Sequence, residues 1–219
     1  KSFDVVIFHE KNLDGALSAY IYWLYKTEGG TKPSDVTWIG VRSDFSRKGN
    51  VSYNIQKILP ELEGKNVLLL DASYNKATHD KISQTANFYL VIDDHGDESL
   101  VDLPNHFVAQ KHATVGVTWK FFFPEEKVPY FIQYADSADA ALNLPYLPEI
   151  NAYTISMYVR FIKNQFKMKI YSKEPEVLFR DIHEFMSGHN VKAVNFMVVL
   201  GLIMSRFREN MKMEITKQA

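Results

Sequence analysis

The segment FYLVIDDH, residues 88–95, passes abruptly from a β-rich apolar run into three ionisable side chains. The same change occurs where DVVIF, residues 4–8, meets His9, and again where NVLLL, residues 66–70, meets Asp71. Short apolar runs that end this sharply are typical of strands buried in a sheet. The sequence therefore predicts three buried strands, each with polar groups at its carboxyl end.

Amphipathic segments separate these strands. DGALSAYIYWLY, residues 14–25, carries apolar residues at helical spacing, and residues 51–62 and 75–86 are also predicted to be helical. Two further strands are predicted over residues 36–41 and 107–109. Strands that alternate with helices favour a parallel sheet covered on both faces. The predicted fold is therefore α/β, with a mostly parallel five-stranded sheet flanked by helices.

From Thr114 onward the apolar spacing is helical, which predicts a helical C-terminal extension. The expected organisation is an α/β domain over residues 1–150 and a helical extension over residues 151–219. The extension is expected either to pack on that domain or to lead to a further C-terminal domain. The helices predicted after the sheet span residues 114–123, 128–141, 150–169, 175–186 and about 191–211.

The composition limits the classes of function. Of 219 residues, 46% are hydrophobic and 23% charged, as is ordinary for a soluble globular protein. A net charge of −1 does not favour nucleic acid or an anionic membrane as a partner. The chain has no cysteine, which excludes disulfides, thiolate metal ligands and cysteine nucleophiles.

An intracellular location, cytoplasmic or in an organellar matrix, is expected. No membrane insertion is expected, because the most apolar stretch spans only residues 193–204.

The polar strand ends are expected to meet at one edge of the sheet, because the ligands of parallel α/β sheets gather beyond the carboxyl ends of the strands. Carboxylates crowded there repel one another unless a cation lies between them. Oxygen-rich sites with one or two histidines suit Mn²⁺ or Mg²⁺ better than Zn²⁺. One or two such ions acidify a water and hold a phosphate for in-line attack. The ionisable groups expected at this edge are His9, Asp14, Asp71, Asp93, Asp94 and His95.

Each of these residues also has a more ordinary interpretation when it is taken alone. Asp14 precedes a predicted helix and would suit a helix cap, and Asp71 would suit a turn. His9 alone would more often be a hydrogen-bonded histidine than a metal ligand, and residues 93–96 would suit a solvated turn. Their joint placement at one edge favours a functional site.

Four short motifs follow one another in a specific order. FHEKNLDG, residues 8–15, is followed by LDASY, residues 70–74, by VIDDHG, residues 91–96, and by YADS, residues 134–137. Over about residues 3–150, these motifs resemble those of the DHH phosphoesterase superfamily, which includes RecJ-type exonucleases, oligoribonucleases and family II pyrophosphatases.

The resemblance implies a metal-binding domain over residues 1–150 and a role for each matching residue. His95 would face the substrate phosphate, and Asp93 would orient the site, so these two are the implied catalytic groups. Asp71 would bridge two ions. The helix that starts at Thr114 would offer backbone N–H groups to a phosphate. The implied metal ligands are His9, Asp14, Asp71, Asp94 and Asp136.

Three departures from the family pattern bear on catalysis. Asp94 stands where the third motif usually has its middle histidine. Gly15 or Ala16 stands where many members carry a second acidic residue, so one ion of a pair would bind weakly. Nothing in residues 150–219 resembles the Gly-rich, basic substrate motif of the usual C-terminal domain.

These observations lead to competing functional hypotheses. The first is a Mn²⁺- or Mg²⁺-dependent phosphoesterase that hydrolyses a small phosphodiester, a short oligonucleotide or a cyclic dinucleotide through metal-activated water. The alternative is a catalytically lapsed DHH-like domain that serves as a scaffold or a subunit of a larger assembly. A third hypothesis is an unrelated α/β fold with an acidic rim.

Two other stretches have residue types that are common in nucleic-acid contacts. WKFFF, residues 119–123, would suit base stacking, but its helical spacing favours packing in the core. The lysines between residues 163 and 173 would suit a phosphate backbone, but a solvated helix face is the more ordinary interpretation.

Overall fold

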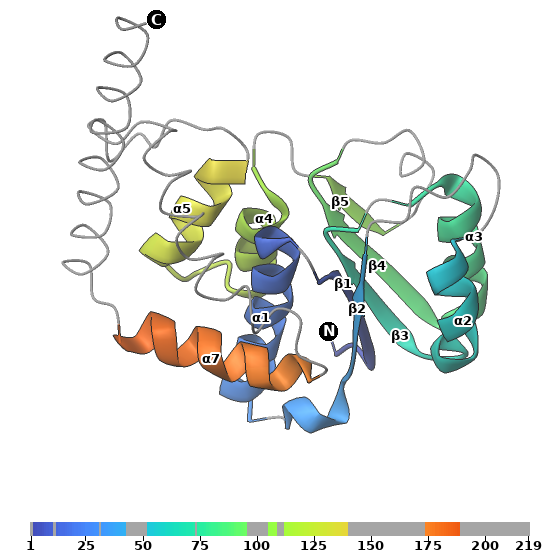
Figure 1. Ribbon diagram of the computed structural model, residues 1–219, viewed down its shortest axis with the longest axis horizontal. Helices are drawn as coiled ribbons and strands as arrows, with labels where there is room; N and C mark the ends of the chain where they lie inside the picture. The colour runs from blue at the N-terminus through green and yellow to red at the C-terminus, as the bar shows by residue number, and fades with distance from the viewer. Residues whose placement is uncertain are drawn as a thin grey trace, which may run out of the picture.

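The computed structural model describes residues 2–10, 12–30, 32–42, 52–72, 74–95, 105–108, 112–139 and 174–188, and the fold is that of these residues. Its centre is a five-stranded sheet in which all neighbouring strands are parallel, in the order β2-β1-β3-β4-β5 (Figure 1). The predicted α/β class with a parallel sheet is therefore confirmed. The strands are β1 (Val5–His9), β2 (Thr37–Val41), β3 (Asn66–Leu70), β4 (Phe88–Asp93) and β5 (His106–Val108).

Helices cover both faces of the sheet (Figure 1). One face carries α2 (Tyr53–Leu62) and α3 (Lys76–Thr85). The other face carries α1 (Leu13–Glu28), α4 (Thr114–Phe122), α5 (Tyr130–Asp139) and α7 (Pro175–Gly188). A short 3₁₀ helix, Pro33–Asp35, precedes β2.

The predicted helices over residues 150–169 and 191–211, like the predicted boundary at residue 150, lie outside the described residues.

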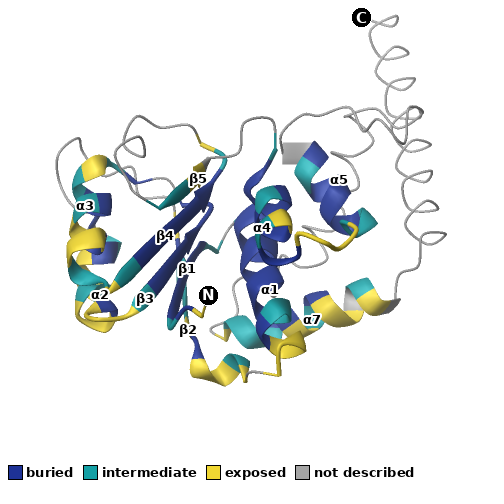
Figure 2. Ribbon diagram, turned by 180° about the vertical axis from the view of Figure 1, so that it is seen from behind, coloured by how far each residue is buried: buried dark blue, intermediate teal, exposed yellow. Residues whose placement is uncertain are grey.

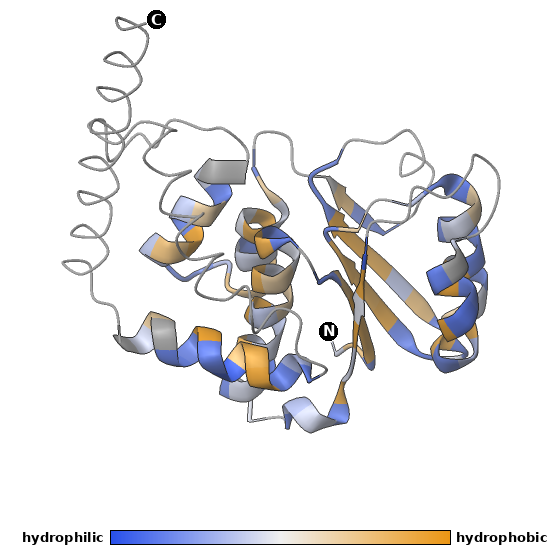
Figure 3. Cartoon of the chain, viewed as in Figure 1, coloured by the Kyte–Doolittle hydropathy of each residue, from blue (hydrophilic) through white to orange (hydrophobic). Residues whose placement is uncertain are grey.

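Side-chain alternation along the strands builds a separate core on each face. In β3, Leu68 and Leu70 join a cluster with α1 and α4, whereas Val67 and Leu69 join a cluster with α2 and α3. All four side chains are fully buried, as a central parallel strand covered on both faces requires. Figures 2 and 3 show buried, apolar strands between the helices, with exposed and polar residues on the outer sides of α2, α3 and α7.

The helix α1 is enclosed on most of its surface. Twelve of its sixteen residues are buried, because it lies between the sheet and α4, α5 and α7. The side chain of Asn12 caps its first turn by accepting a hydrogen bond from the backbone N–H of Asp14. Only residues 10–12 separate β1 from α1, so this connection lies at the carboxyl edge of the sheet.

The helix α7 packs on the α/β domain. Its Phe179 is fully buried, with ring centroids 4.8 Å from Trp38 and 5.9 Å from Phe8. The exposed ring of His183 shares a 3.1 Å hydrogen bond between its Nδ1 and the hydroxyl of Tyr20. The described part of the predicted extension therefore belongs to the same core as the sheet.

Within the described ranges, no helix combines the length and the apolar character that crossing a bilayer would need.

Truncation of Phe179 to alanine is expected to lower the free energy of unfolding by about 3–5 kcal/mol, because it opens a cavity between α7 and the sheet. The control is Arg180→Ala, an exposed neighbour in the same helix, for which we expect a change below about 0.5 kcal/mol. Urea unfolding followed by circular dichroism measures both variants. Equal, small effects of the two would argue against docking of α7.

Candidate metal centre at the carboxyl edge of the sheet

The ends of β3 and β4 bring four ionisable side chains together. Asp71 follows β3, Asp93 ends β4, and Asp94 and His95 come next. Because β3 and β4 are parallel neighbours, these residues meet at one edge of the sheet. One ligand atom from each lies within 4.8 Å of the other three, a spacing that a metal ion would suit. We call these four residues the edge cluster.

Asp71 has the least compensated charge of the edge cluster. Its side chain is fully buried, yet neither carboxylate oxygen has a hydrogen-bond partner within the described part of the chain. Two imidazole nitrogens approach it: Nδ1 of His9 lies 3.6 Å from Oδ2, and Nδ1 of His95 lies 4.0 Å from Oδ1. Burial raises the pKa of the Asp71 carboxyl from an ordinary 3.8 to about 6, and the interaction with His9 opposes this only in part. An ionised Asp71 therefore calls for a cation.

The backbone at Asp71 is also unusual. Its φ of 52° lies in the left-handed region, and no other non-glycine residue of the described ranges has a positive φ. This conformation costs about 1–2 kcal/mol for an L-residue, and less for aspartate than for most. The N–H of Asp71 still donates to the carbonyl of Ile92 in β4, at 3.1 Å. The strand therefore turns directly after its last ladder bond, with the carboxylate at the sheet edge.

The imidazole of His95 binds the other two carboxylates of the edge cluster. Its Nδ1 lies 2.7 Å from Asp93 Oδ1 and 3.1 Å from Asp94 Oδ1. Hydrogen bonds with Asp93 and then Asp94 raise the pKa of His95 to about 11, although burial opposes this. His95 is therefore a cation at neutral pH and supplies one positive charge to three carboxyl groups.

Asp94 connects the edge cluster to α4. Its N–H donates to Thr114 Oγ1 at 3.0 Å, and that hydroxyl donates to Asp94 Oδ1 at 3.1 Å. Burial alone would raise the pKa of the Asp94 carboxyl, but hydrogen bonds from His95 and Thr114 together hold it below its ordinary value. Asp94 is thus ionised and held by donors on two sides.

His9 and Gly15 complete the surroundings of Asp71. A β-carbon at Gly15 would lie 2.5 Å from the carbonyl oxygen of His9 and 3.0 Å from Asp71 Oδ2. Glycine is therefore required for α1 to start this close to β1 and β3. Sequence reasoning treated this position as a missing acidic ligand, whereas the structure gives the glycine a packing role of its own.

The structure places Asp14 at the first turn of α4. Its side chain is buried, with Oδ2 accepting from the N–H of Thr114 at 3.0 Å and Oδ1 from that of Val115 at 2.7 Å. A carboxylate at a helix N-terminus is stabilised by the helix dipole as well as by these bonds. The Thr114 N–H, which was expected to face a phosphate, donates to Asp14 instead. Asp14 therefore binds the start of a distant helix, whereas the cap of α1, the helix that it was expected to cap, is Asn12.

Asp136 binds the same helix from α5. Its Oδ1 accepts from the N–H of Ala113 at 2.7 Å, and its Oδ2 lies 2.9 Å from Nδ1 of His112. A β-carbon at Gly116 would lie 2.5–2.7 Å from the carboxylate of Asp136, so glycine makes room for it. The other ring nitrogen of His112 lies 3.1 Å from Nζ of Lys120.

The residues predicted for the site thus fall into two groups that Thr114 connects. One group is the edge cluster with His9 beside Asp71, and the other is Asp14 and Asp136 at the first turn of α4.

The sequence patterns did not indicate His112, Lys120 or the roles of the two glycines. The glycines lie one residue after Asp14 and two after Thr114, but their contacts depend on how α1 and α4 pack.

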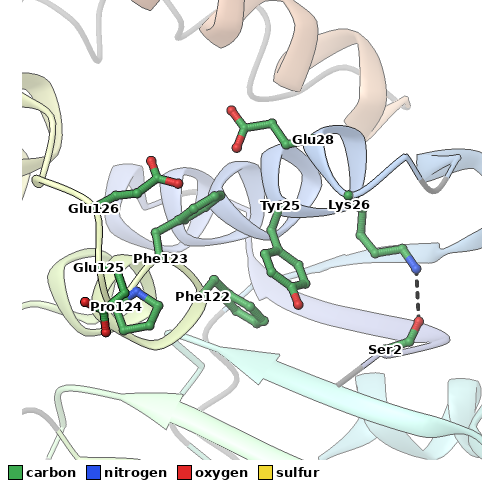
Figure 4. Close-up of a pocket in the computed structure, with 10 residues that line it drawn as sticks. Ser2, Tyr25, Lys26, Glu28, Phe122, Phe123, Pro124, Glu125 and Glu126 are labelled. Atoms are coloured by element: carbon green, nitrogen blue, oxygen red, sulfur yellow. Dashed lines mark hydrogen bonds between the residues drawn. The ribbon is translucent and has the colours of Figure 1, made fainter.

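A pocket of about 620 Å³ lies elsewhere, between the ends of α1 and α4 (Figure 4). Tyr25, Phe122 and Phe123 are among its lining, and Lys26 reaches across to Ser2 Oγ at 2.9 Å. It adjoins the C-terminal end of α1, whereas Gly15 in the first turn lies against Asp71, and the helix rises roughly 15 Å from Gly15 to Tyr25. The pocket is therefore separate from the edge cluster.

Comparison with known proteins gives one distant relative without an assigned function. The chain is 31% identical over 143 residues to an uncharacterized protein of Acanthamoeba polyphaga mimivirus. The match covers 62% of this chain and 33% of the viral protein, so the chain spans about a third of that relative's length. No protein-family model and no solved structure matches the chain.

In metal-free protein, Asp71→Asn is expected to raise the free energy of unfolding above pH 6. The folded-state pKa is above the unfolded value, so the ionised carboxylate destabilises the fold progressively as the pH rises from about 4 to about 6. A shift of this size corresponds to at most about 3 kcal/mol, and asparagine also tolerates positive φ. The gain should disappear below pH 4.

Chemical unfolding with a chelator, at pH 3.5 and pH 7.5, measures this difference. Asp80→Asn is the matched control, because Asp80 is a partly exposed carboxylate on α3 that forms a surface pair with Lys76. A loss of stability in Asp71→Asn at pH 7.5 would contradict the assignment of Asp71 as an uncompensated charge.

Gly15→Ala is expected to lower the free energy of unfolding by about 1–3 kcal/mol, because the new methyl group meets backbone that cannot yield. Ser18→Ala, in the same helix, is the control. Its hydroxyl is buried without a hydrogen-bond partner among the described residues, so its removal should be neutral or stabilising. Urea unfolding that ranked Ser18→Ala below Gly15→Ala in stability would refute the close approach of α1.

Proposed function

We propose that this chain is a divalent-metal-dependent phosphoesterase of the DHH type, which hydrolyses a small phosphodiester or a short oligonucleotide. The single observation that carries the proposal is Asp71, a fully buried carboxylate at a positive φ. Neither of its oxygens has a hydrogen-bond partner in the described ranges. It lies in a cluster whose members would all reach one ion. The four ordered sequence motifs support the family assignment.

The donor set fits Mn²⁺ or Mg²⁺. The edge cluster offers three carboxylates, with the imidazole of His9 beside Asp71, and oxygen-rich sets of this kind suit hard divalent cations. Its negative charge exceeds the single positive charge of His95, so a dication would neutralise it. Asp71, Asp93 and Asp94 would hold the ion, with His9 beside Asp71. Once bound, it would supply acidification of a water and charge neutralisation at the phosphate.

The side chains have distinct tasks in this proposal. Asp93 and Asp94 both engage Nδ1 of His95, which leaves Nε2 to donate to a phosphate oxygen. The side chain of His95 is 56% exposed, so a substrate can reach it. A cationic imidazole held in this way would stabilise charge that develops on the phosphate during attack. The hydroxyl of Thr114 donates to Asp94 and so fixes the position of the edge cluster relative to α4.

A lapsed DHH-like domain that acts as a scaffold is the second candidate. The observation that favours it is that Asp14 and Asp136, both implied as metal ligands, accept hydrogen bonds from the first turn of α4. Ligation by either would require these bonds to be exchanged.

Titration calorimetry with Mn²⁺ distinguishes these candidates first. The wild type is expected to bind at least one ion, and Asp71→Asn to lose or strongly weaken that binding. The control Asp80→Asn, outside the cluster, should bind as the wild type does. No binding by the wild type would reject the enzyme and leave the scaffold.

Where Mn²⁺ binds, hydrolysis of a dinucleotide in its presence is the second measurement. Asp71→Asn should reduce the rate by at least about 10³-fold, since an ion supplies several kcal/mol of transition-state stabilisation. Binding without any hydrolysis by the wild type would favour the scaffold.

A further inference from the structure

Phe107 is an exposed aromatic ring on the outer strand of the sheet. Its surface is 46% exposed, and no other large hydrophobic side chain of the described residues is exposed. It lies on β5, at the edge of the sheet next to β4. A lone apolar side chain at a protein surface is common, so exposure by itself indicates little. The support and the position of this ring are what distinguish it.

Neighbouring rings hold Phe107 in place. The centroid of Phe121 lies 5.1 Å away in an edge-on arrangement, and Phe121 in turn lies 4.9 Å from Phe122. Phe122 packs in the core against Tyr22 and Tyr25, at 5.0 and 5.1 Å. The exposed ring is thus the outermost member of a series of ring contacts that begins in the core. A ring supported in this way loses little conformational entropy when a ligand stacks on it.

The ring lies one strand away from the edge cluster, at the level of Ile92, two residues before Asp94. Phe107 pairs with Ile92, which directly precedes Asp93 and Asp94, and adjacent strands are about 4.8 Å apart. Phe107 contacts Phe121 of α4, and Asp94 contacts Thr114 of the same helix. Both side chains therefore lie on the α4 side of the sheet.

We propose that Phe107 is a stacking platform for a nucleobase of the substrate whose phosphate is held at the edge cluster. The inference rests on the proposed function and narrows its substrates to nucleotide phosphodiesters. Stacking needs no hydrogen-bond readout, because every base has a π-face. A protein partner is a poorer fit. The three residues of β5 are too few for strand addition, and one ring is much smaller than a docking patch.

The test uses the full chain with Mn²⁺ and a dinucleotide analogue with a non-hydrolysable methylene-bridged phosphonate. One analogue carries 2-aminopurine, whose fluorescence falls on stacking, and a matched analogue is abasic. Phe107→Ala is expected to weaken binding of the base-containing analogue by about 5- to 150-fold, as expected for loss of one stacked base. Phe107→Trp should preserve both affinity and quenching. The abasic analogue should bind equally to wild type and Phe107→Ala.

Several results would overturn the platform. They are equal affinity of wild type and Phe107→Ala for the base-containing analogue, failure of the wild type to bind it, or a sedimentation shift showing that Phe107 is covered by a second copy. The failures of the two proposals are distinguishable. Base-dependent binding without hydrolysis of a natural dinucleotide removes the enzyme and keeps the platform. Hydrolysis of the dinucleotide at a rate that does not depend on Phe107 keeps the enzyme and removes the platform.

Discussion

The buried carboxylate of Asp71 is the constraint around which the edge of the sheet is arranged. Transfer of a carboxylate out of water costs several kcal/mol, and neither oxygen of Asp71 has a hydrogen-bond partner among the described residues, although the imidazoles of His9 and His95 approach to 3.6 and 4.0 Å. The fold nevertheless encloses this carboxylate. Asp71 follows β3, the central strand, and the first turn of α1 contains Gly15, where a β-carbon would meet His9 and approach Asp71. The enclosure that shapes this site therefore also raises the pKa of its central group.

The first turn of α4 is a second positive centre that divides the carboxylates of the sequence motifs. Asp14 and Asp136 approach this turn from two different helices and accept three backbone N–H bonds from it. The helix dipole and these donors stabilise two negative charges without a metal ion. At the ends of β3 and β4, the N–H of His95 donates to Asp93, whereas neither carboxylate oxygen of Asp71 has a hydrogen-bond partner among the described residues. The fold thus relieves part of the repulsion between carboxylates at the carboxyl edge of the sheet. The repulsion that remains is between the carboxylates of the edge cluster.

The order of strands and helices along the chain could be predicted because three of the strands, β1, β3 and β4, are apolar runs that end abruptly. Parallel pairing then places Asp71 beside Asp93 and Asp94, so the edge cluster was also accessible from sequence. The partners of Asp14 and Asp136 were not, since they depend on where α4 docks, a hundred residues along the chain from Asp14. The stretch WKFFF shows the same limit. Helical spacing correctly indicated core packing for Trp119, Phe122 and Phe123, but the contact of Phe121 with β5 depends on tertiary placement.

The choice between enzyme and scaffold follows from what Asp71 does to stability. A scaffold requires only a folded surface, and asparagine or glycine would suit the positive φ at this position without an uncompensated charge. Strain and unpaired polar groups of this kind concentrate at functional sites, where activity offsets a loss of stability. A cation between Asp71, Asp93 and Asp94 would remove the repulsion and make the burial favourable. The proposed metal centre therefore accounts for the buried Asp71 better than a purely structural role does, even though Asp14 and Asp136 bind the first turn of α4. A centre that retains only the edge cluster and His9 would hold fewer ions than the two-ion centre that the resemblance implies.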